Sequence, residues 1–128
     1  MKERIALLCR ALRAGQPAVT ALVTGCRGAT PRSPGALLVL TAETALGTVG
    51  GGQAEHDIIQ QGWHQCLSAE ELRHMGQEYG GEEEILLLRW TSQDLPLAEQ
   101  MVLAMEQNAD CSLQIEYKEG CWRGTLLP

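Results

Sequence analysis

Apolar and polar residues follow two different periods along the chain, and each change of period marks the boundary of an expected element. Between Lys2 and Ala14 the apolar residues recur every three or four positions, which predicts an amphipathic helix that Gly15 ends. From Val19 to Thr24 apolar residues fall on both faces of an extended chain and β-branched residues dominate, which predicts a strand. By the same reasoning, further strands are expected over 36–41, 46–49 and 83–90, and further helices over 53–67 and 95–107.

The second half of the chain continues this alternation of elements. Ser68-Ala69-Glu70-Glu71 has the form of a capping box, which predicts a short helix that reaches about Met75. Alternation from Cys111 to Tyr117, a turn at 118–120 and a further run over 121–126 predict a terminal β-hairpin. The helix expected over 53–67 would bury one stripe of residues, namely Ile58, Ile59, Gly62, Trp63 and Cys66.

The order of these elements favours the α+β class. We expect a single mixed β-sheet covered by helices, followed by the terminal hairpin, in one domain over residues 1–128. Hydrophobic residues make up 45% of the chain and Phe is absent, so the core must be aliphatic, with Trp63, Trp90 and Trp122 as its large members.

Cysteine usage and hydropathy indicate a cytoplasmic protein. The five cysteines are an odd number without a Cys-x-x-Cys pair, which argues against a secreted disulfide framework. No apolar run approaches the ~20 residues that cross a bilayer, and the charged N-terminus does not resemble a signal peptide. Four cysteines fall on apolar stripes and are expected to fill the core: Cys9, Cys66, Cys111 and Cys121.

Charge is distributed unevenly and limits the candidate ligands. The net charge of −6 argues against duplex nucleic acid as a partner. Residues 1–64 carry six Lys/Arg and four Asp/Glu, whereas residues 65–128 carry four and twelve. An anionic ligand is therefore expected at the first half, near Arg27 and Arg32.

Residues 25–35, the Pro-Arg loop, are the first candidate for chemistry. Pro31 and Pro34 stiffen the backbone around Arg32, and a guanidinium on a stiff loop suits bidentate capture of phosphate or carboxylate. Thr30 and Ser33 add hydroxyl donors. Cys26 lies beside Arg27, which would favour a thiolate. The alternative is a surface loop whose arginine is only solvated.

Residues 47–52, the glycine segment, are the second candidate. Consecutive glycines between a strand and a helix allow backbone N–H groups to approach an anion. Glu55 stands where a dinucleotide fingerprint needs its third glycine, so a Rossmann site is not indicated. Its carboxylate would either complement the helix dipole or accept N–H donors from a heterocycle such as a pterin. The histidines share no metal-ligand spacing with the cysteines, and we expect no metal site.

Together the two segments resemble the N-terminal domain of the XdhC/CoxI family, the accessory factors of xanthine dehydrogenase. The resemblance lies in Ala29-Thr30-Pro31-Arg32-Ser33-Pro34-Gly35-Ala36 and in Gly47-Thr48-Val49-Gly50-Gly51-Gly52-Gln53-Ala54-Glu55. Longer members add a C-terminal Rossmann domain, which we do not expect in residues 1–128. Many also carry Cys-Gly-Gly where this chain has Tyr79-Gly80-Gly81.

The resemblance implies a chaperone rather than an enzyme. Such a protein would bind molybdenum cofactor (molybdopterin), assist its sulfuration with a cysteine desulfurase, and deliver it to the apo-enzyme of a xanthine dehydrogenase-type molybdenum hydroxylase, as a homodimer. The binding residues implied are Cys26, Thr30, Arg32, Ser33, Gly35, Gly50, Gly51, Gly52 and Glu55. Two alternatives remain. One is a regulatory or scaffolding subunit that docks on a separate Rossmann-domain or hydroxylase partner, and the other is a nucleotide-binding enzyme domain that uses the glycines to bind a pyrophosphate.

Overall fold

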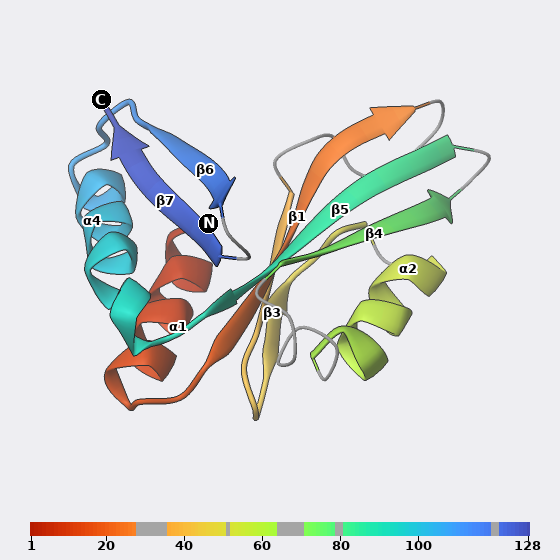
Figure 1. Cartoon of the computed structure of the whole chain (residues 1–128), viewed down its shortest axis with the longest axis horizontal. Coiled ribbons are helices and arrows are strands. Elements are labelled where there is room, and N and C mark those ends of the chain that lie inside the picture. Colours follow the sequence, from red (N-terminus) through yellow and green to blue (C-terminus); the bar gives the residue numbers. More distant parts are fainter. Residues whose placement is uncertain (28–35, 51, 64–70, 79–80, 119–120) are drawn as a thin grey trace.

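The computed structural model describes residues 1–27, 36–50, 52–63, 71–78, 81–118 and 121–128 (Figure 1). In chain order the elements are α1 (Lys2–Arg13), β1 (Ala18–Arg27), β2 (Leu37–Leu40), β3 (Ala45–Gly47), α2 (Gly52–Asp57), the π-helix η1 (Ile58–Gly62), β4 (Glu71–Glu78), β5 (Gly81–Trp90), the 3₁₀-helix η2 (Ser92–Asp94), α4 (Leu95–Glu106), β6 (Ser112–Lys118) and β7 (Cys121–Leu127). None of the described helices is both long and apolar enough to cross a membrane.

The strands form two antiparallel sheets. The first has five strands in the order β3-β2-β1-β5-β4, and the second is the hairpin β6-β7. The α+β class and the terminal hairpin are confirmed. The pairing within the main sheet was expected to be mixed, but all its described pairs are antiparallel. For β2–β3 and β4–β5 the reason is connectivity, because each pair is a hairpin and parallel neighbours would need long crossovers.

Strands β1, β2 and β5 bury side chains on both faces of the main sheet, because successive residues of a strand point to opposite sides. On one face, α1, α4 and the hairpin gather; on the other lies α2 (Figure 1). The first cluster contains Ile5, Leu8, Cys9, Leu12, Leu37, Val39, Leu86, Leu88, Trp90, Ala98 and Trp122 among others. The second contains Val19, Ala21, Val23, Leu38, Leu40, Val49, Ile58, Ile85 and Leu87, with Trp63 packed against it.

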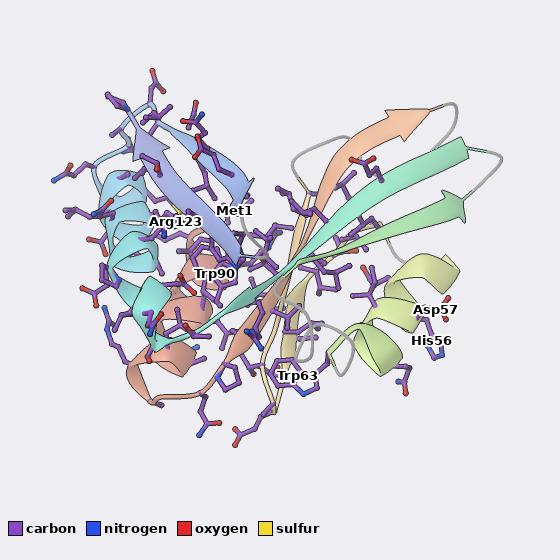
Figure 2. The ribbon with its side chains drawn as sticks, in the orientation of Figure 1. Met1, His56, Asp57, Trp63, Trp90 and Arg123 are labelled. Carbon is purple, nitrogen blue, oxygen red and sulfur yellow. The ribbon has the colours of Figure 1, made fainter. Side chains whose placement is uncertain are left out.

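The tryptophans are core residues, as expected. Trp90 and Trp122 contact each other edge to face, with ring centroids 4.8 Å apart, and join the hairpin to the sheet. Trp63 packs against the second cluster, at the end of the helical segment that α2 begins (Figure 2). The aliphatic core therefore has its large aromatic members divided between the two faces of the sheet.

The short helix expected from Ser68 to Met75 is wrong over its described part, because Glu71–Glu78 form strand β4. Residues 68–70 lie outside the described residues. A helix of so few residues has little stability of its own. Pairing with β5 instead gives this segment a full ladder from Glu71↔Leu88 to Glu78↔Gly81.

Two further side-chain expectations are wrong. Ile59 was placed in the buried stripe of its helix but is 40% exposed. The cause is the π-helix: its i→i+5 hydrogen bonding brings Ile58 and Trp63, five residues apart, to the core together and turns Ile59 outward. Cys111 was expected in the core but is exposed, because β6 begins only at Ser112.

Candidate functional site

The described residue that follows the Pro-Arg loop lies close to the glycine segment in the main sheet. The Val23 N–H donates to the carbonyl oxygen of Ala36 at 2.9 Å, and the Thr48 N–H donates to that of Leu37 at 3.2 Å. Ala36 is the first described residue after the Pro-Arg loop, and Thr48 lies in the glycine segment. Backbone hydrogen bonds in the sheet therefore place the residue that follows the Pro-Arg loop close to the start of the glycine segment.

The described part of the glycine segment, residues 47–50, is called the glycine turn below, and its backbone requires glycine at two places. Gly47 has φ of 100° and Gly50 has φ of 115°, both in the left-handed region. A Cβ at Gly47 would also overlap the Leu37 carbonyl oxygen and would lie 2.9 Å from the Arg4 side chain. The half-buried Arg4 of α1 thus lies against the glycine turn.

Glu55 organises this turn from the first helical residues that follow it. Its Oε1 accepts the Val49 N–H at 2.9 Å and also the Thr48 hydroxyl. The Thr48 Oγ1 in turn accepts the Gly50 N–H at 2.9 Å. With the bond from Thr48 N–H to Leu37, three consecutive backbone N–H groups already have acceptors inside the protein.

Val49 anchors the glycine turn in the core. Its side chain is fully buried and belongs to the same cluster as Ile58, which is 2% exposed. Because Val49 precedes α2 and Ile58 follows it, apolar burial fixes both ends of the segment that carries Glu55. Glu55 itself is half-buried.

Several residues predicted for the site lie outside the described residues: Thr30, Arg32, Ser33, Gly35 and Gly51. Gly52 begins α2, and Gly50 is the last residue of the glycine turn. Cys26 lies in strand β1, not in a loop, at a register position opposite Glu83 of β5. A single pocket formed by Arg32 and the glycines remains a prediction.

The sequence reasoning did not select Thr48, Val49 or Arg4. Thr48 and Glu55 are seven residues apart across a turn, a spacing that belongs to no local hydrogen-bonding motif. Arg4 reaches Gly47 from a different element, through the packing of α1 against the sheet. Neither contact could be predicted from the spacing of residues in the sequence.

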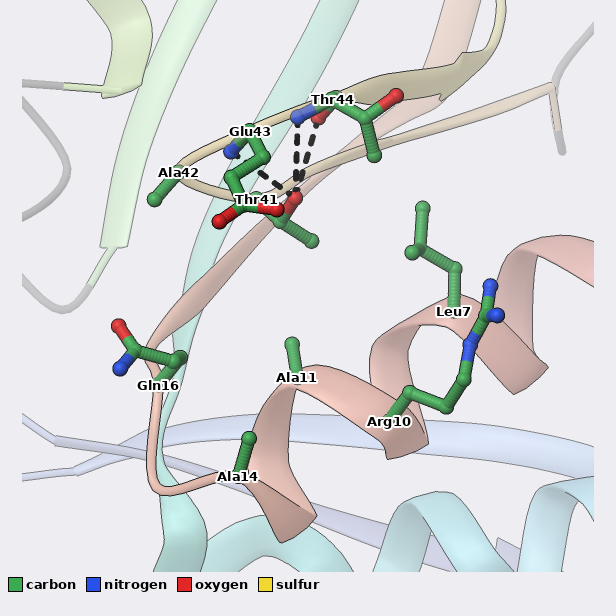
Figure 3. A pocket seen from close by; sticks show the side chains of 9 residues that line it. All are labelled: Leu7, Arg10, Ala11, Ala14, Gln16, Thr41, Ala42, Glu43 and Thr44. Atoms are coloured by element: carbon green, nitrogen blue, oxygen red, sulfur yellow. Dashed lines mark hydrogen bonds between the residues drawn. The ribbon is translucent and has the colours of Figure 1, made fainter.

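A separate pocket of ≈ 700 Å³ lies between α1 and the β2–β3 turn (Figure 3). The Thr41 hydroxyl accepts the Thr44 N–H at 3.2 Å and holds the turn that forms one wall. Its lining residues are Leu7, Arg10, Ala11, Ala14, Gln16, Thr41, Ala42, Glu43 and Thr44. None of them was predicted as a site residue.

Two observations on the described side chains concern metal ligands and thiols. Across the described ranges, no three His, Cys, Asp or Glu residues gather as metal ligands would. Cys9 is buried, and this burial raises the pKa of its thiol; Arg13 lowers it and Glu99 raises it further. Cys9 therefore serves as an apolar core residue, as expected.

These features define a small α+β domain. Its antiparallel sheet packs against core clusters on two sides, and its glycine turn leads into a short helix that carries the half-buried Glu55. The model of the XdhC and CoxI family matches residues 11–76, which include β1, the glycine segment and most of β4. The chain belongs to the XdhC and CoxI family, as the two sequence segments predicted.

A solved structure supports the fold independently. The chain is similar to a crystal structure of a xanthine dehydrogenase from Bacillus halodurans, with a TM-score of 0.76 and 16% sequence identity. The match covers 97% of this chain and 42% of the other, so the chain spans less than half the length of that protein. No curated protein sequence matches the chain.

Proposed function

We propose that this protein is an accessory factor that binds molybdenum cofactor and assists its insertion into a xanthine dehydrogenase-type molybdenum hydroxylase. Membership of the XdhC and CoxI family and the likeness to a xanthine dehydrogenase structure support an accessory role. The observation that carries the proposal is the placement of Ala36 and Thr48 on adjacent backbone at one end of the sheet. Ala36 directly follows the Pro-Arg loop and Thr48 lies in the glycine segment, so a site that both segments share is what we propose.

The described residues suit the heterocyclic part of such a ligand. The carboxylate of Glu55 is an acceptor, and the N–H groups of a pterin are donors. The guanidinium of Arg4 beside Gly47 adds a cation for the anionic part. When bound, the cofactor would supply the molybdenum centre for the client enzyme. The residues of this chain would only hold and orient the ligand, which makes the protein a carrier and not a catalyst.

Calorimetric titration with molybdopterin tests the proposal. Wild-type protein should bind, and Arg32→Ala should bind at least about tenfold more weakly. The reason is that the free energy of one hydrogen bond to a charged group corresponds to at least that change in affinity. Arg123→Ala, which removes an exposed arginine on β7, is the matched control and should bind like wild type. Absence of binding by the wild-type protein would exclude the carrier function.

The proposed partners need a separate experiment. We propose that the protein acts as a homodimer on the apo-hydroxylase, with a cysteine desulfurase as a further partner. Affinity purification from the native host, followed by pterin analysis of the complex, checks this. A hydroxylase recovered together with pterin supports insertion, whereas a partner recovered without pterin indicates a scaffolding subunit.

A further inference from the structure

We propose that Glu55 is a specificity-determining residue that rejects anions from the glycine turn. Strand-to-helix glycine turns commonly bind anions through successive backbone N–H groups. Here the same groups are occupied from within: Val49 donates to the Glu55 carboxylate and Gly50 donates to Thr48. Glu55 therefore stands where a bound anion would otherwise be held.

Two effects oppose the binding of an anion at the glycine turn: the backbone N–H groups already have acceptors, and the Glu55 carboxylate is itself negatively charged. A phosphate would have to displace the Glu55 carboxylate from Val49, and the Thr48 hydroxyl would lose its acceptor in the same step. If the carboxylate stayed nearby, it would repel the incoming charge at short range. Building repulsion against one ligand class is a common source of specificity.

This rejection orients the ligand of the proposed function. The anionic group must lie away from residues 48–50, on the side of Gly47 where Arg4 lies, and a face that carries N–H donors must meet the Glu55 carboxylate. The orientation rests on the proposed function, whereas the rejection of anions does not. The two are therefore tested by different probes.

Titration with inorganic phosphate, followed by the amide NMR signals of Val49 and Gly50, tests the rejection without any pterin. In the wild-type protein these two signals should not move. In Glu55→Ala they should shift and saturate, with phosphate affinity at this turn raised by about tenfold or more, the ratio expected from gaining hydrogen bonds to a charged ligand.

Matched variants separate occupancy from charge and from folding. Glu43→Ala removes the same charge from the exposed β2–β3 turn and should leave both signals unmoved. Glu55→Gln keeps an acceptor for Val49 and should also exclude phosphate. Should Glu55→Ala not fold, Thr48→Val tests the charge alone: it frees the Gly50 N–H while the Glu55 carboxylate stays, so phosphate should still leave both signals unmoved.

Two results would overturn the proposal. One is a saturable phosphate shift at Val49 and Gly50 in the wild-type protein. The other is a folded Glu55→Ala protein whose two signals ignore phosphate. Failure of the wild-type protein to bind molybdopterin would leave the phosphate result standing and would exclude only the proposed function.

Discussion

The indole N–H of Trp90 donates to the hydroxyl oxygen of Thr20 at 2.9 Å inside the core. Trp90 is 2% exposed and Thr20 is 4% exposed, so neither group has ready access to water. The two residues lie on the paired central strands β5 and β1. Trp90 also contacts Trp122, whose own indole N–H donates to the Arg89 carbonyl oxygen at 2.7 Å. The bond to Thr20 thus fixes the ring that connects the sheet to the terminal hairpin.

Replacing Thr20 with Val should lower the free energy of unfolding by about 1–3 kcal/mol, because a buried indole N–H would lose its acceptor while the side-chain shape is kept. Urea unfolding followed by circular dichroism measures the change. Thr20→Ser retains the hydroxyl and should lose less. Equal stability of Thr20→Val and wild type would show that the bond contributes nothing net.

Replacing Gly47 with Ala should destabilise the protein more than replacing Gly15 with Ala. Both glycines have positive φ, of 100° and 75°, which costs about 1–2 kcal/mol for a residue with a Cβ. A Cβ at Gly15 meets nothing within 4 Å, whereas at Gly47 it overlaps the Leu37 carbonyl and approaches Arg4. Thermal unfolding of the two variants measures the difference. Equal losses would mean that the backbone at Gly47 shifts without cost.

The elements that could be predicted from the sequence are those with a strong local period. The stripe of Ile5, Leu8, Cys9 and Leu12 is buried as the helical spacing indicates, and α4 and the hairpin lie where expected. Strand β4 could not be predicted, because its local sequence favours no strand and its conformation comes from pairing with β5. The strand pairing with β5 outweighed the local preference of this segment for a helix.

The candidate site was predictable as a pair of segments but not as a set of contacts. The glycines marked the turn, since few other residues tolerate positive φ at Gly47 and Gly50. The partners of Glu55 could not be found in the same way. The path of the backbone from Val49 to Glu55 decides whether the Glu55 carboxylate faces a ligand or the Val49 N–H. The burial of Val49 in the core sets this path.

Cys9 and Cys111 should differ sharply in reactivity. Cys9 is 1% exposed and burial raises the pKa of its thiol, so both access and thiolate content are low. Cys111 is exposed at the start of the hairpin. Iodoacetamide labelling of the native protein, read by peptide mass spectrometry, should modify Cys111 first and Cys9 only on unfolding. Labelling of both at one rate in denaturant is the control, and early native labelling of Cys9 would contradict its place in the core.

The raised pKa of the Cys9 thiol also predicts a pH dependence of stability. At alkaline pH the unfolded chain releases this proton before the folded protein does, so the unfolded state binds fewer protons and the free energy of unfolding falls as pH rises. The stabilisation that comes from this pKa difference is complete below the ordinary thiol pKa of about 8.5, and it is lost as the pH rises towards the pKa of Cys9 in the folded protein. Arg13 opposes the shift and Glu99 reinforces it.

Urea unfolding of wild type and Cys9→Ala between pH 7 and pH 10 isolates the effect of this thiol. The variant should start less stable, because a small cavity replaces the sulfur, but its stability should decline less steeply above about pH 8.5. The other cysteines are common to both proteins, so their contributions cancel in the comparison. Parallel curves above that pH would mean that the Cys9 thiol ionises alike in the folded and unfolded chains, against its burial between α1 and the sheet.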